Sequence, residues 1–266
     1  MSEIKINLAP RGSKAAGEIH VKRVGSGPAL MLVHGFPFSS GMWWNQVDGL
    51  ADRFDLVIPD LRGFGQSSDL ESGWEIRDFA DDLARATQFL KIESLIYCGL
   101  SLGGYVGFEL LSKYPELISK IVLCNTRASI DDQATARGRR LMAERVRREG
   151  TGFVKPTMLP RLLAKPNAGK VRVTGLDGLF EGLRAESIAQ TQIAMANRRN
   201  FAPLLHSIDL PVTLIAGEGD AITPVTEMSG MAAGIEGAEL HVVSNAGHLT
   251  PIENPEEFNQ VLNGLS

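Results

Sequence analysis

Short apolar segments recur along the chain, and each is closed by a glycine, an aspartate or an asparagine. The segment at 19–25 alternates apolar and polar residues, which is typical of an antiparallel strand with one exposed face. Further segments are mostly unbroken apolar runs, at 28–35, 55–60, 94–99, 120–125, 212–217 and 239–245. Unbroken runs predict strands that are covered on both faces, as in a parallel sheet.

Longer segments between these runs carry apolar residues at helical spacing. The segment at 74–90 places them on one helical face, at Ile76, Phe79, Ala80, Leu83, Ala86 and Leu90. The segments at 104–114 and 255–262 show a similar pattern. Strands that alternate with helices imply right-handed crossover connections, so the pattern predicts a layered α/β fold.

The stretch at 127–207 breaks this alternation. It shows no clear strand pattern and predicts several short helices separated by Gly and Pro. An insertion of this length in a compact sheet protein usually has structure of its own, often as a lid over a site. We therefore expect a core domain formed by 1–126 and 208–266, with 127–207 as a helical cap.

Composition narrows the possible partners. The 266 residues, with 44% hydrophobic and 22% charged, suit one large α/β domain with an insertion, or two small domains. A net charge of −4 argues against nucleic acid and against electrostatic attachment to an anionic membrane. No run approaches the roughly 18 to 20 apolar residues of a membrane helix, and the first residues lack the apolar segment of a secretory signal. We expect a cytoplasmic protein, a monomer or small homo-oligomer.

One serine stands among several glycines where an apolar run ends and a helical segment begins. Residues 99–103 read Gly-Leu-Ser-Leu-Gly, with Ser101 at the centre. This Gly-x-Ser-x-Gly pattern between strand and helix is typical of a nucleophilic serine on a strained turn. The glycines remove side chains that would clash, and the Leu102 amide becomes free to donate to an oxyanion. The alternative interpretation is a plain turn between strand and helix.

A serine needs a base to take its proton, and the base needs an anion to hold its tautomer. Of the five histidines, His248 lies in a Gly-containing loop directly after the last apolar run. Asp220 follows the preceding run, and Glu218 is its nearest competitor. His34 is interpreted as a residue that stabilises its own loop. The order Ser101, Asp220, His248 is the one expected for a sheet of this kind.

The oxyanion of an acyl-transfer intermediate needs a second donor. The turn after the run at 28–35 presents the Phe36 backbone amide, while Pro37 has no N–H to donate. An apolar substrate pocket is predicted from large side chains near these motifs, with ordinary packing as the alternative for each. They are Phe36, Phe38, Trp43, Met142, Met158 and Phe180. The basic residues Arg137, Arg139 and Arg140 are interpreted as a solvated helix face, with contact to a substrate carboxylate as the alternative.

These motifs, taken in order, resemble the α/β-hydrolase superfamily. The resemblance implies a mostly parallel eight-stranded sheet with flanking helices and a cap inserted after the sixth strand. It also implies Ser101 as nucleophile, Asp220 as acid and His248 as base, with oxyanion donors at Phe36 and Leu102. Within the superfamily, the segments at 98–110 and 121–131 are similar to 3-oxoadipate enol-lactone hydrolases and related bacterial carboxylesterases. That pattern expects a tryptophan early in the cap, whereas all three tryptophans here precede Ser101.

The sequence thus predicts a serine hydrolase that cleaves small carboxylic esters or lactones through an acyl-enzyme. The implied chemistry needs neither a metal ion nor an organic cofactor. The two cysteines, Cys98 and Cys124, are interpreted as buried free thiols, because two residues make neither a disulfide framework nor a zinc site. Ser101, Asp220 and His248 are also compatible with carbon–carbon bond hydrolysis, with perhydrolase activity, or with a ligand-sensing role.

Overall fold

An eight-stranded sheet forms the centre of the computed structural model, which describes residues 1–7, 17–69, 73–165 and 175–265. The strands are β1 (Ser2–Asn7), β2 (Glu18–Val24), β3 (Ala29–Val33), β4 (Asp55–Pro59), β5 (Leu95–Leu100), β6 (Ile118–Cys124), β7 (Val212–Gly217) and β8 (Glu239–Val243). Their order is β1-β2-β4-β3-β5-β6-β7-β8. The pairs β1/β2 and β2/β4 are antiparallel and all others are parallel, so the predicted mostly parallel sheet is confirmed.

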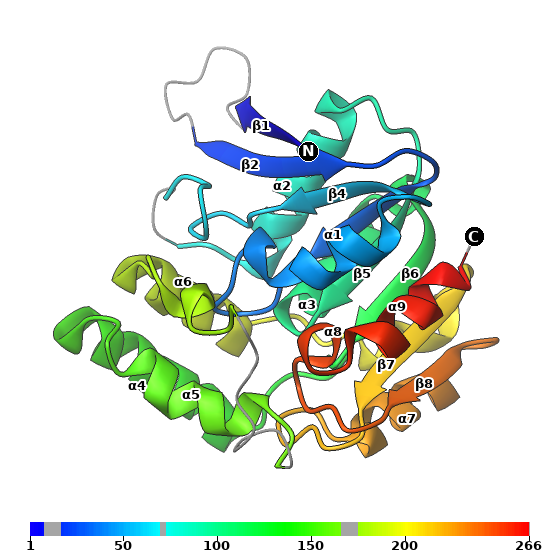
Figure 1. The fold of residues 1–266 in the computed structure, drawn as a ribbon. Coiled ribbons are helices and arrows are strands. Elements are labelled where there is room, and N and C mark those ends of the chain that lie inside the picture. Colours follow the sequence, from blue (N-terminus) through cyan, green and yellow to red (C-terminus); the bar gives the residue numbers. More distant parts are fainter. Residues whose placement is uncertain (8–16, 70–72, 166–174, 266) are drawn as a thin grey trace.

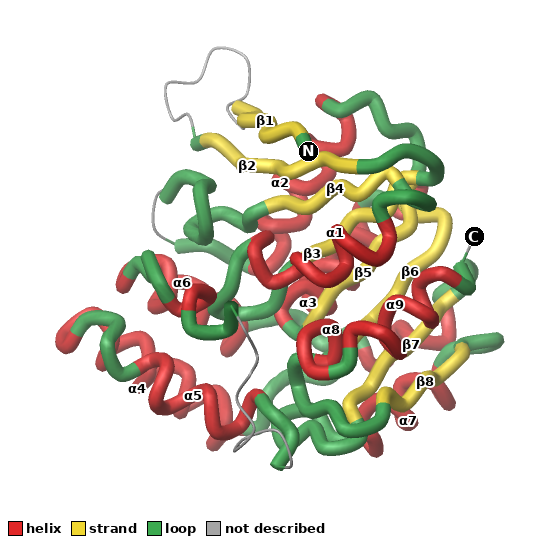
Figure 2. Tube along the Cα trace, in the orientation of Figure 1, coloured by secondary structure: helices red, strands yellow, loops and turns green. Residues whose placement is uncertain are grey.

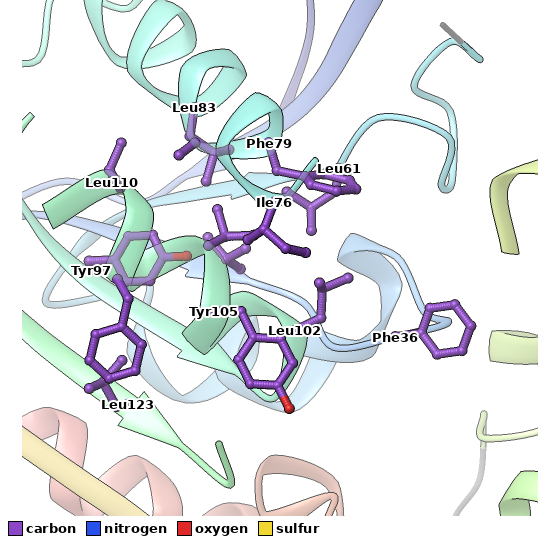
Figure 3. Close-up of a cluster of buried hydrophobic side chains, with 14 of the residues drawn as sticks. Phe36, Leu61, Ile76, Phe79, Leu83, Tyr97, Leu102, Tyr105, Leu110 and Leu123 are labelled. Carbon is purple, nitrogen blue, oxygen red and sulfur yellow. The ribbon is translucent and has the colours of Figure 1, made fainter. Parts of the chain in front are cut away.

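Helices cover both faces of this sheet (Figure 1). They are α1 (Trp44–Leu50), α2 (Ile76–Phe89), α3 (Leu102–Lys113), α7 (Val225–Gly234), α8 (Thr250–Glu253) and α9 (Pro255–Asn263), with short 3-10 turns η1 (Ser40–Trp43) and η2 (Pro115–Leu117). Side chains alternate along each strand and feed two apolar clusters. In β3, Leu30 and Leu32 join the cluster of α1 and α9, while Met31 and Val33 join that of α2 and α3. Figure 3 shows the cluster of α2 and α3.

The apolar pattern did not predict every element. The strand β1 was missed because only Ile4 and Ile6 alternate in it, yet Ile6 is buried and pairs with Ile19 of β2. The helix α3 begins at Leu102, two residues before the predicted start, because the turn at Ser101 leads directly into it. The helices α1 and α7 were also not predicted.

Between β6 and β7 the described residues form helices and no strand. They are α4 (Gln133–Glu149), α5 (Val154–Leu162), η3 (Gly178–Phe180), α6 (Ala185–Ala196) and η4 (Ala202–Ser207). Figures 1 and 2 show α4, α5 and α6 gathered to one side of the sheet. The predicted cap also includes 166–174, which lies outside the described residues. Throughout the described ranges, no helix combines the length and the apolar character needed to cross a bilayer.

Candidate active site

Ser101 occupies a strained turn between β5 and α3. Its backbone angles are φ 51° and ψ −105°, a conformation that costs a non-glycine residue on the order of 1–3 kcal/mol. Neighbouring groups hold it there: the Ser101 amide donates to the Cys124 carbonyl at 2.9 Å, and the Thr126 hydroxyl donates to the Ser101 carbonyl at 2.8 Å. The strain is concentrated at the residue that the sequence singles out as a nucleophile.

Two glycines allow the chain to close around this turn. A Cβ atom on Gly99 would lie 2.4 Å from the Gly103 carbonyl oxygen, and one on Gly103 would lie 2.4 Å from the Val33 carbonyl oxygen. Both contacts are with backbone atoms, which have little room to move. The glycines of the Gly-x-Ser-x-Gly motif are therefore required by close approach of three chain segments.

His248 and Asp220 form a buried pair at the ends of neighbouring strands. His248 Nδ1 lies 2.8 Å from Asp220 Oδ2, so Nδ1–H donates to the carboxylate and Nε2 is left as an acceptor. The other carboxylate oxygen, Oδ1, accepts from the amides of Ile222 at 2.7 Å and Thr223 at 3.0 Å. Burial opposes ionisation, but the charge and hydrogen bond of His248, with the Thr223 amide and Asn125, lower the pKa of Asp220 below its ordinary value.

Asn125, at the end of β6, supports this pair and was not predicted to do so. Its side-chain amide donates to Asp220 Oδ2 at 2.9 Å and to the Gly247 carbonyl at 3.2 Å, while its oxygen accepts from the Thr250 hydroxyl at 2.8 Å. The sequence signal was available, since a polar residue closes a strand next to the serine strand. Asn125 fixes the carboxylate relative to the histidine loop.

Glu253 ties the same loop to the end of α5. Its Oε1 accepts from the amides of Gly247 at 2.8 Å and Leu249 at 3.3 Å, on either side of His248. Its Oε2 accepts from the Ala164 amide at 2.8 Å. The position of the histidine is thus coupled to the helices between β6 and β7 through one carboxylate.

The two predicted oxyanion donors lie at the start of a helix and in a turn. Leu102 is the first residue of α3, and Phe36 lies in the turn after β3. Neither amide has a protein acceptor within the described part of the chain, as expected for an N-terminal helix amide. Both amides remain able to donate to a bound oxygen.

His34 is fully buried and has both ring nitrogens occupied. Its Nδ1 donates to the Gly35 carbonyl at 3.0 Å, and its Nε2 accepts from the Leu61 amide at 2.9 Å. Burial lowers the pKa of His34, so the ring is neutral. This geometry agrees with the prediction that His34 organises its own loop.

A cavity of about 490 Å³ brings Ser101 and His248 together with Phe36. Its other described lining residues are Tyr105, Arg127, Asp131, Thr135, Gly138, Arg139, Met142, Thr157, Met158, Arg161, Leu162, Gln192, Met195 and Ile222. The predicted pocket residues Met142 and Met158 are among them. Of the three arginines considered in the sequence, Arg139 alone is among them.

The structure places the other predicted pocket residues outside this lining. Phe38 and Trp43 are fully buried in the cluster of α1 and α9, where Trp43 packs on Phe258 at a ring distance of 6.1 Å. Phe180 makes an edge contact with Phe38 at 5.3 Å. The three aromatic side chains pack with one another and with the core cluster. The sequence did not reveal this, because the side of the chain that an apolar residue presents depends on tertiary contacts.

Comparison with known proteins agrees with this architecture. A family model for the alpha/beta hydrolase fold matches residues 28–163. A thermophilic esterase from Thermogutta terrifontis, solved with malate bound, superimposes with a TM-score of 0.92 at 34% identity, covering 98% of this chain and 97% of that one. The 3-oxoadipate enol-lactonase 2 of Acinetobacter baylyi is 27% identical over 90% of this chain and 88% of its own length. The pimeloyl-(acyl-carrier protein) methyl ester esterase of Nitrosospira multiformis is 30% identical over 90% of this chain and 95% of its own.

The chain belongs to the alpha/beta hydrolase family. It is related to enol-lactonases and esterases, as the sequence motifs predicted.

Proposed function

We propose that this protein hydrolyses small carboxylic esters or lactones through an acyl-enzyme on Ser101. The observation that carries the proposal is the buried pair of His248 and Asp220, joined at 2.8 Å, whose histidine lines the same cavity as Ser101. Its relatives include proteins named as esterases and an enol-lactonase, which supports ester bonds as the target.

In the acylation step, the Ser101 hydroxyl attacks the substrate carbonyl and passes its proton to His248 Nε2. The imidazolium that forms is stabilised by Asp220, which stays ionised because its pKa is lowered. The Phe36 and Leu102 amides donate to the oxyanion. Each such donor typically contributes on the order of a hundredfold to a thousandfold in rate.

Acylation is completed when the first intermediate collapses and His248 gives the proton it took from Ser101 to the leaving alkoxide. In the deacylation step, the neutral ring takes a proton from a water molecule that attacks the acyl-enzyme. The second intermediate then collapses, the acid is released, and His248 returns this proton to the Ser101 oxygen. All proton transfers are assigned to groups of the chain and to water.

The proposal includes the predicted division of the chain, with a core of 1–126 and 208–266 and a cap of 127–207. Its support is that the cavity joins Ser101 and His248 of the core to Met142 of α4 and Met158 of α5. Residues 166–174 of this cap lie outside the described residues. We also propose a cytoplasmic location, which the two buried free thiols, Cys98 and Cys124, suit because that compartment is reducing.

Steady-state hydrolysis of p-nitrophenyl acetate, measured by release of p-nitrophenol, tests the proposal. We expect turnover by the wild type and its loss in Ser101→Ala. The matched control is Ser112→Ala, because Ser112 is an exposed serine of α3, the helix that begins directly after Ser101; this variant retains wild-type turnover. Equal turnover by Ser101→Ala and wild type, or no turnover by either across short esters and lactones, contradicts the proposal.

A further inference from the structure

The cavity beside Ser101 carries a surplus of positive charge. Its described lining includes three arginines, at 127, 139 and 161, and a single carboxylate outside the His248–Asp220 pair, that of Asp131. The remaining lining is largely apolar or uncharged, with Met142, Met158 and Met195 among it. The surplus favours a ligand of negative charge over a neutral one.

Of the three lining arginines, Asp131 pairs with Arg139, and it also pairs with Arg198, so it leaves the charges of Arg127 and Arg161 uncompensated. Its carboxylate lies 2.6 Å from Arg139 Nε and 2.8 Å from Arg198 Nη1, and its side chain is 1% exposed. Burial opposes ionisation of Asp131, but the hydrogen bond and charge of Arg139, with the charge of Arg198, lower the pKa of this carboxyl. Arg139 is therefore a structural partner of Asp131.

Among the described residues, Arg161 and Arg127 have no such carboxylate partner. Arg161, in the last turn of α5, is exposed and forms no hydrogen bond or ion pair with any residue in the described ranges. Arg127 donates through one guanidinium nitrogen to the Ile222 carbonyl at 2.6 Å. No described carboxylate lies within ion-pair distance of its guanidinium. Two guanidinium groups thus line the cavity with donors to spare.

Both arginines follow or precede residues that hold the reacting groups. Arg127 follows Thr126, whose hydroxyl donates to the Ser101 carbonyl at 2.8 Å. Arg161 precedes Leu162, whose carbonyl accepts from the His248 amide at 2.9 Å. Ser101, Arg127 and Arg161 line one cavity.

We propose that Arg161 and Arg127 form a subsite for a carboxylate of the substrate. The preferred substrates are then esters or lactones that carry a second, free carboxylate, such as half-esters of short dicarboxylic acids. A guanidinium group suits this task because its planar donors match the two oxygens of a carboxylate. This inference rests on the proposed ester hydrolysis and specifies, in addition, that the preferred substrate is negatively charged.

The test compares two substrates that differ in one charge, monoethyl glutarate and diethyl glutarate, by ethanol release. For Arg161→Gln we expect kcat/KM on the half-ester to fall by about tenfold, the effect of one charge-assisted hydrogen bond at an exposed position. The value for the diester stays unchanged. The matched control is Arg137→Gln on α4, an exposed arginine outside the cavity lining, which leaves both values unchanged.

A binding measurement separates this inference from the proposed reaction. Glutarate itself is expected to inhibit diester hydrolysis competitively, and to do so more weakly in Arg161→Gln. If the wild type hydrolyses the diester but Arg161→Gln affects both esters equally and leaves glutarate inhibition intact, the subsite is wrong and the esterase proposal stands. If the wild type hydrolyses neither ester nor any lactone, the proposed function fails, and the substrate class with it.

Discussion

Asp220 accepts four hydrogen bonds, from His248 and Asn125 on one oxygen and from Ile222 and Thr223 on the other. An asparagine has the same shape but accepts on one terminal atom only, because the other carries two hydrogens. Asp220→Asn therefore keeps the packing of the site and creates a conflict between donors. Each orientation of the new amide leads to a different conflict.

With its nitrogen toward His248, the new amide meets two donors, Nδ1–H of His248 and the side-chain amide of Asn125. The histidine relieves this conflict by moving its proton to Nε2, the atom that must accept from Ser101. With its nitrogen toward the backbone amides of Ile222 and Thr223, the new side chain leaves both amides without an acceptor, which costs about 1–3 kcal/mol of stability for each. The loop contacts favour the first orientation.

The expected result is a fall in kcat of about ten-thousandfold, as known for the wrong histidine tautomer in serine hydrolysis. This factor corresponds to about 5 kcal/mol of transition-state stabilisation. KM changes little, because Asp220 is not among the described residues that line the cavity. Kinetics on p-nitrophenyl acetate measure both values.

Glu218→Gln provides the control, because Glu218 is the competing acid in the same loop. It is exposed and accepts from the Asn245 amide at 3.1 Å. We expect it to retain the wild-type kcat. A variant Asp220→Asn with near wild-type kcat, or a large loss in Glu218→Gln, would refute the assignment of the acid.

Three other predictions concern the surroundings of the site. Glu253→Ala frees the amides on both sides of His248, and we expect kcat to fall by about a hundredfold because the ring is misplaced. Glu253→Gln should retain more activity than Glu253→Ala. Equal kcat in the wild type and both variants would contradict the role of Glu253 in positioning His248. Gly103→Ala places a Cβ 2.4 Å from the Val33 carbonyl oxygen and is expected to destabilise the fold by about 1–3 kcal/mol in urea unfolding, so an unchanged midpoint would contradict the close approach. The pKa of His34 is lowered in the folded state, so the unfolded chain binds a proton that the native protein does not. The free energy of unfolding should therefore fall as the pH drops below about 6.5, and more steeply in the wild type than in His34→Gln; equal slopes would contradict this.

The sequence predicted those parts of the molecule whose signal is local. The turn at Ser101 could be predicted because its glycines are adjacent to it, and the loops of Asp220 and His248 because each follows an apolar run. The strand β1 escaped prediction because two alternating isoleucines are a weak pattern. Its burial depends on pairing with β2.

The supporting residues of the site could not be predicted in the same way. Asn125 and Glu253 act through contacts with segments far away in the chain, over 95 residues to Asp220 and 89 residues to Ala164. The same holds for Arg161, whose role depends on which face of α5 meets the cavity. Phe38 and Trp43 show the opposite case, since large apolar residues near a motif were predicted to line the pocket and are packed in the core.

The most direct test of the central claim is peptide mapping by mass spectrometry after reaction with a fluorophosphonate, which labels activated serines covalently. The account predicts one adduct per chain, on Ser101, and the labelled fraction of Ser101 should equal the fraction of esterase activity that is lost. It also predicts that Asp220→Asn is labelled slowly. An adduct on another residue that accompanies the loss of activity, or full activity in protein whose Ser101 is completely labelled, would contradict it.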